Sequence, residues 1–117
     1  MDARELRIGN YVTVDHPRHG EKYIEVESVT NDTINMEFRP YYIGDLQPIP
    51  LTEDWLLKFG FVYIYGEWHK EGFNFCINDK IVYTSNEFNY TEVCKLESVH
   101  QLQNLYYSLT GEELCIT

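Results

Sequence analysis

The residues best suited to chemistry are four histidines, three cysteines and a set of scattered carboxylates. Asp15, His16 and His19 could converge on a metal ion, because imidazoles and carboxylates are ordinary zinc ligands. Pro17 and Gly20 in the same stretch indicate a hairpin loop instead, and a lasting site would need another ligand from elsewhere in the chain. We therefore expect a solvated loop here, and a protein with no metal and no cofactor.

The cysteines indicate buried free thiols. Cys76, Cys94 and Cys115 are odd in number and have no C-x-x-C spacing, which argues against both a disulfide framework and a zinc site. His69 or His100 could pair with a cysteine in catalysis, but no local feature of the sequence would activate a thiol. Phosphate-binding, nucleophile-elbow and zinc-protease motifs are absent from the sequence. We expect no enzymatic activity.

Tyrosines are unusually numerous, at 10 of 117 residues. Neighbouring residues of a strand point to opposite faces, and a phenolic hydroxyl seeks a polar partner, so some of these tyrosines must reach the surface. Exposed aromatic side chains among carboxylates are typical of protein interfaces. Tyr41, Tyr42, Tyr63 and Tyr65 are therefore candidate partner-binding residues. The alternative is that the tyrosines simply cover two small sheets.

The composition of the chain limits the kinds of partner that it can bind. The formal net charge is -10, from 19 acidic and 9 basic residues, and no cluster of Lys and Arg offers a face for a phosphate backbone. Direct nucleic-acid binding is disfavoured, whereas a basic protein surface would be attracted. No apolar run is long enough to span a membrane, and the N-terminus does not have the composition of a signal peptide. We expect a cytoplasmic protein without membrane contact.

Alternating apolar residues predict a β-rich first segment over residues 1–50. Strands are expected over 11–14, 23–29, 34–38 and 41–43. The third strand should end before Arg39-Pro40, because proline cannot donate a ladder hydrogen bond. Several short strands with tight turns favour an SH3-like small β-barrel or a bent sheet.

A short linking helix is predicted over residues 51–61, with both ends specified. Thr52 is placed as the N-cap, where its hydroxyl can accept from the first free amides. Gly60 suits the left-handed residue after the helix, and Phe61 can then fold back on Leu56.

The second segment, 62–117, predicts an antiparallel β-meander with a C-terminal helix packed on it. Its strands are expected over 62–65, 68–70, 73–77, 80–84 and 91–96. A capping box of Ser98 and Gln101 then opens a helix that ends at Gly111. Val99, Leu102, Leu105, Tyr106 and Leu109 recur at helical spacing, and the buried stripe is expected to be Val99, Leu102, Leu105 and Leu109. The fold class is thus α+β, with 1–117 as a single compact unit subdivided at 1–50, 51–61 and 62–117.

Three phrases of the sequence resemble a family of small uncharacterised proteins of Bacteroidetes and their phages. They are Ile-Gly-Asn-Tyr-Val at 8–12, Pro-Ile-Pro-Leu-Thr-Glu-Asp-Trp-Leu-Leu-Lys-Phe-Gly-Phe at 48–61, and Val-His-Gln-Leu-Gln-Asn-Leu-Tyr-Tyr-Ser-Leu-Thr-Gly-Glu-Glu-Leu at 99–114. The resemblance covers the order of elements over most of the chain and implies a phage or mobile-element context. It carries no activity or site residue.

The leading functional hypothesis is a non-enzymatic protein-binding module of phage or prophage origin, which modulates a host protein through an acidic surface. A second hypothesis is a virion or assembly component that self-associates. The third is a small enzyme, which would need a pocket joining His69 or His100 to a cysteine or carboxylate. The sequence does not indicate the oligomeric state.

Overall fold

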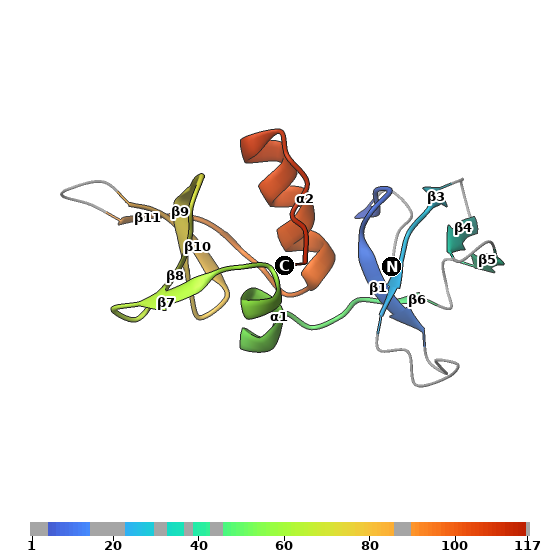
Figure 1. The fold of residues 1–117 in the computed structure, drawn as a ribbon, viewed down its shortest axis with the longest axis horizontal. Helices are drawn as coiled ribbons and strands as arrows, with labels where there is room; N and C mark the ends of the chain where they lie inside the picture. Colours follow the sequence, from blue (N-terminus) through green and yellow to red (C-terminus); the bar gives the residue numbers. More distant parts are fainter. Residues whose placement is uncertain are drawn as a thin grey trace. The chain divides into compact units, whose positions relative to one another are not determined.

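The computed structural model of the chain describes residues 5–14, 23–29, 33–36, 39–42, 46–85 and 90–116. It confirms the α+β class, with two helices and antiparallel sheets (Figure 1). The chain divides into two compact units. The first unit consists of Met1–Pro50 with Ser98–Asn104, and the second of Leu51–Glu97 with Leu105–Thr117.

The first unit contains two three-stranded antiparallel sheets. One has the order β2 (Ile24–Glu25), β1 (Tyr11–Val14) and β6 (Leu46–Gln47), and the other the order β3 (Ser28–Val29), β4 (Thr33–Met36) and β5 (Arg39–Tyr42). Within the described residues these sheets do not close, so the barrel alternative is wrong. The ladder breaks between the two-residue strands β2 and β3, and a barrel needs a continuous, staggered ladder.

β4 ends at Met36, before Arg39 and Pro40 as expected, but Pro40 is itself part of the next strand. It lies inside β5, opposite Asn35 of β4, and Arg39 pairs with Met36. The position is tolerable because β5 is the outer strand of its sheet, where a missing N–H can face away from the ladder.

The core of the first unit is small and apolar. It consists of Leu6, Val12, Ile24, Val26 and Leu46, with Val29 packed against it. Apolar side chains alternate with polar ones along β1 and β2, as a half-buried sheet requires.

Residues 99–104 of the C-terminal helix α2 (Val99–Thr110) also belong to the first unit, and polar side chains bond them to it. Gln103, only 1% exposed, accepts from the Tyr11 amide at 2.8 Å and donates to the Gly9 carbonyl at 3.0 Å. Asn104 accepts from the buried Asn10 side chain at 2.9 Å and donates to the Glu5 carbonyl at 2.8 Å. The loop before β1 therefore has its buried polar groups satisfied by the helix.

The second unit begins with helix α1 (Glu53–Lys58), whose C-terminal end is as predicted. Gly60 has a φ of 87°, and its N–H donates to the Leu57 carbonyl while that of Phe61 donates to Leu56. This pair of bonds is a Schellman motif. The N-terminal prediction is wrong in one respect, because the Thr52 side chain makes no capping hydrogen bond.

A five-stranded antiparallel meander follows, in the order β11-β10-β9-β8-β7. The strands are β7 (Val62–Ile64), β8 (Glu67–Lys70), β9 (Phe73–Asn78), β10 (Ile81–Ser85) and β11 (Tyr90–Lys95). All five predicted strands are therefore confirmed, with bounds shifted by one residue. Figure 1 shows them in green to orange.

Residues 105–110 of α2 belong to this second unit. Tyr106 is buried and its ring lies 5.4 Å from that of Phe73, which in turn contacts Phe61. Of the expected buried stripe, Val99 and Leu102 are buried, whereas Leu105 is half-buried and Leu109, in the last turn of the helix, is 41% exposed. No helix among the described residues is long and apolar enough to cross a membrane.

Candidate functional site

Cys76 and Cys94 are poor nucleophiles, whereas Cys115 is exposed and Cys94 only half-buried, so the expectation of three buried thiols is wrong. Cys76 is fully buried in β9, and its thiol donates to the Tyr83 carbonyl at 3.8 Å. Burial raises the pKa of Cys76, and the nearby carboxylate of Glu67 raises it further. Burial, together with Glu92, also raises the pKa of Cys94. Both thiols stay protonated at neutral pH, and the thiolate is the reactive form.

The two described histidines contact oxygen atoms. His69 Nε2 lies 3.2 Å from Glu67 Oε2 at the surface of β8. His100 Nδ1 lies 3.2 Å from Ser98 Oγ, and each of these two residues is only 3% exposed. A substrate could not reach that hydroxyl without opening the first turn of α2. Gln101 meanwhile accepts from the Ser98 amide at 3.3 Å, so this half of the predicted capping box is present.

The β7–β8 hairpin, residues 62–70, exposes apolar side chains at the edge of the five-stranded sheet. Val62, Tyr63 and Ile64 of β7 are all exposed, with 61% of the Tyr63 surface accessible. Exposed apolar edge strands are ones that proteins normally shorten, charge or cover, because they attract other chains. β7 is short, but its side chains are neither charged nor covered by any described residue.

Tyr65 at the tip of this hairpin is the most unusual residue of the described chain. It is 99% exposed and has a φ of 50°, followed by Gly66 with a φ of 85°. Two successive residues in this left-handed region form the type I′ turn that joins β-strands best, and its first position favours asparagine, aspartate or glycine. A tyrosine there gains no burial and has an unfavourable backbone conformation.

Tyr63 connects the hairpin tip to the interior of the sheet. It lies opposite Trp68 of β8, and the two rings are 5.2 Å apart. Trp68 in turn lies opposite Ile77 of β9. Directly opposed residues share a face, so these three side chains form a row on one side of the sheet.

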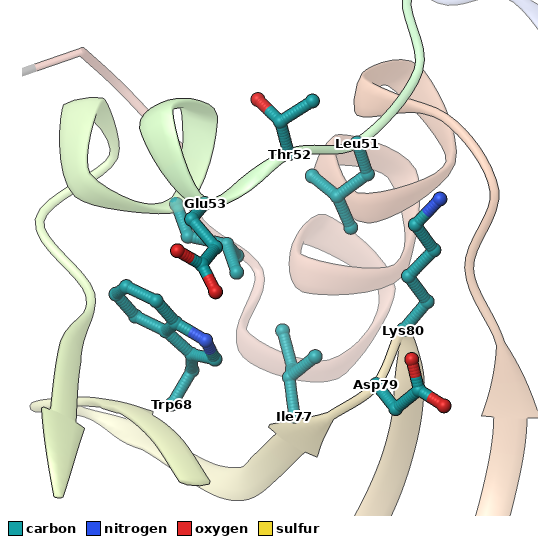
Figure 2. Close-up of a pocket in the computed structure, with 8 residues that line it drawn as sticks. Leu51, Thr52, Glu53, Trp68, Ile77, Asp79 and Lys80 are labelled. Carbon is teal, nitrogen blue, oxygen red and sulfur yellow. The ribbon is translucent and has the colours of Figure 1, made fainter. Parts of the chain in front are cut away.

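Next to this row lies the Trp68 pocket, with a volume of about 310 Å³. It is lined by Leu51, Thr52, Glu53, Leu56, Trp68, Ile77, Asp79 and Lys80, all from the second unit. Figure 2 shows the Glu53 carboxylate above the Trp68 indole, whose nitrogen faces into the pocket. Lys80 lies on the opposite side of the pocket, beside Leu51.

The polar rim of the Trp68 pocket comes from two turns. Thr52 precedes α1 and Glu53 is its first residue, and the Thr52 hydroxyl makes no capping hydrogen bond. Asp79 and Lys80 form the β9–β10 turn, with φ values of 49° and 65°. The lining includes neither histidine nor cysteine, and no group of three or more metal-ligating side chains occurs among the described residues. The pocket thus combines a polar rim with an apolar floor.

The chain matches no protein-family model, no curated protein and no solved structure.

The structure brings some of the candidate tyrosines together. Tyr63 and Tyr65 share the β7–β8 hairpin of the second unit. Tyr41 and Tyr42 lie in β5 of the first unit, and their side chains are outside the described part of the chain. The predicted loop with Asp15, His16 and His19 also falls outside the described residues.

Sequence reasoning missed the Trp68 pocket. Its polar residues each suit a local structural role, since Glu53 fits the first turn of a helix and Asp79 fits a hairpin turn. Only the pairing of β7, β8 and β9 places Tyr63, Trp68 and Ile77 in one row. The sequence predicts the order of these strands in a meander, but it does not predict their register.

Proposed function

We propose that this chain is a non-enzymatic protein-binding module that contacts its partner through the β7–β8 hairpin. The observation that carries the proposal is Tyr65, an exposed aromatic side chain in a left-handed backbone conformation. The stability of the fold does not favour a tyrosine in this conformation, whereas strained residues often occur at binding sites. Tyrosine is also among the residues that dominate interface energetics.

The partner has a basic surface. The net charge of -10 would draw such a surface toward the chain. The resemblance to proteins of Bacteroidetes and their phages supports a phage or prophage origin, with a host protein of the cytoplasm as the partner. The raised thiol pKa values of Cys76 and Cys94, and the closed Ser98–His100 contact, support binding over catalysis.

Affinity capture from a Bacteroidetes lysate tests the proposal. The wild-type chain should enrich a defined protein, and Tyr63→Ser with Tyr65→Ser should lower its recovery about tenfold or more, as expected for interface hot spots. Tyr107→Ser is the matched control, because Tyr107 is a 43% exposed tyrosine away from the hairpin. The proposal fails if nothing is enriched, or if the double variant captures as much as the control.

A self-associating virion or assembly component is the alternative, and the uncovered edge of β7 favours it. Two copies could pair their β7 strands into one continuous sheet. Light scattering over a wide range of concentrations distinguishes the two functions. A strict monomer at high concentration removes the alternative, whereas a dimer that dissociates on Ile64→Lys substitution in β7 supports it.

A further inference from the structure

The Trp68 pocket contains a hydrogen-bond donor without an acceptor. Trp68 is 8% exposed, and its indole N–H faces into the pocket with no hydrogen-bond partner among the described residues. An indole nitrogen can only donate. This N–H is open to solvent, so a group that displaces solvent from it must either bring an acceptor or move one into place.

The acceptor nearest to hand is Glu53. Figure 2 shows its carboxylate directed into the pocket above the indole. It is an exposed side chain, so it can move without disturbing the core. A carboxylate has about four acceptor positions, so one group could receive the Trp68 N–H and a ligand at the same time.

The charge and shape of the pocket favour a cation on an aliphatic stem. Two carboxylates, Glu53 and Asp79, stand against one ammonium group, Lys80, and the walls of Leu51, Leu56 and Ile77 are apolar. The volume of about 310 Å³ leaves room for one long side chain.

Arginine fits this description better than lysine. Its guanidinium group is planar, stacks on aromatic rings and presents several donors to a carboxylate. The Tyr63 ring, 5.2 Å from that of Trp68, extends the aromatic surface on this face of the sheet. The ammonium group of lysine is compact and strongly hydrated, so it would stack less well on the rings and would not bond to both carboxylate oxygens at once.

We infer that the Trp68 pocket receives an arginine side chain from the partner protein. The guanidinium group binds Glu53 and draws its carboxylate down to accept the Trp68 N–H, while the aliphatic stem lies against Leu51 and Ile77. The inference rests on the proposed protein-binding function, because a partner supplies the arginine. It predicts that the partner's contact residue beside the hairpin is basic.

Nuclear magnetic resonance of the indole N–H groups tests the pocket without the partner. The chain has two tryptophans, so its ¹⁵N spectrum has two indole signals, which Trp55→Phe assigns. N-acetyl-arginine amide should shift the Trp68 signal downfield in a saturable way, since that proton gains an acceptor. N-acetyl-citrulline amide has the same shape without the charge, and should bind about fivefold more weakly.

Three variants test which charges around the pocket control the affinity for arginine amide. Glu53→Gln should weaken arginine amide binding about fivefold, whereas Asp54→Asn, in the same exposed helical turn but outside the pocket lining, should leave it unchanged. Lys80→Gln should strengthen binding about twofold, because it removes the repelling charge.

Other outcomes overturn the inference. Tighter binding of N-acetyl-leucine amide would mean an apolar pocket, and a shift with N-acetyl-glutamate amide that Lys80→Gln abolishes would mean an anion site. Absence of a shift with every probe would overturn it as well. Partner capture that still depends on Tyr63 and Tyr65 would then leave the proposed function standing.

Discussion

Replacing Tyr65 with asparagine is expected to stabilise the second unit. The backbone φ of 50° lies in the left-handed region, where a residue with a β-carbon is disfavoured by roughly 1–2 kcal/mol. Asparagine tolerates this region because its side chain can bond to the local backbone. Since the tyrosine side chain is 99% exposed, its removal sacrifices almost no buried surface. The net gain should be about 1 kcal/mol.

Urea unfolding followed by tryptophan fluorescence measures this gain. Both tryptophans of the chain, Trp55 and Trp68, lie in the second unit, so their emission reports that unit. With a slope of about 1–2 kcal/mol per molar urea, the midpoint should rise by about 0.5–1 M. Glu71→Asn is the matched control, since Glu71 is an exposed turn residue with a negative φ. An unchanged or lowered midpoint in Tyr65→Asn would refute the argument from strain.

The same substitution should weaken partner capture, because it removes the exposed ring. A gain in stability with a loss of binding separates a binding residue from a merely tolerated one. If Tyr65→Asn raised stability and left capture intact, the tyrosine would be a structural accident, and the proposed contact surface would be wrong.

Three further outcomes follow from the structure. Burial lowers the pKa of His100 below its usual value near 6.5, so the unfolded chain binds the proton more readily than the folded chain. The free energy of unfolding should therefore decrease as the pH falls below about 6.5. Between pH 7.5 and pH 5.5, the melting temperature should fall less in His100→Asn than in wild type. Gly60→Ala places a β-carbon at a φ of 87° and should cost about 1 kcal/mol in urea unfolding, and an unchanged midpoint would count against the Schellman geometry. Iodoacetamide should alkylate the exposed Cys115 first and Cys76, buried with a raised pKa, last, and mass spectrometry showing the reverse order would contradict the described burial.

Local chemistry explains which parts of the fold could be predicted from the sequence. The end of α1 at Gly60 and Phe61 needs only six successive residues, and the structure has both of the expected hydrogen bonds. The strands from β7 to β11 likewise follow from alternating residues and turn signals that lie next to each other in the chain. The residues of such an element and its immediate neighbours are enough to specify it.

Long-range pairing explains what could not be predicted. Gln103 and Asn104 were part of a helical pattern, yet their side chains bond to Gly9, Tyr11 and Glu5, more than 90 residues away in the sequence. No spacing rule connects these segments. The segments 8–12 and 99–104 meet in this polar network, which explains their polar residue types by architecture.

The departures from local rules in the second unit occur close together. Thr52 leaves its helix uncapped, Lys80 occupies a left-handed position, and Tyr65 does the same at the hairpin tip. All three lie in the β7–β8 hairpin or on the rim of the Trp68 pocket. In foldable sequences such conflicts are expected mainly at functional or strained sites. Because Tyr63 links the hairpin and the pocket through its contact with Trp68, one partner could engage both. This clustering is therefore a stronger argument for a binding face than the exposure of any single tyrosine.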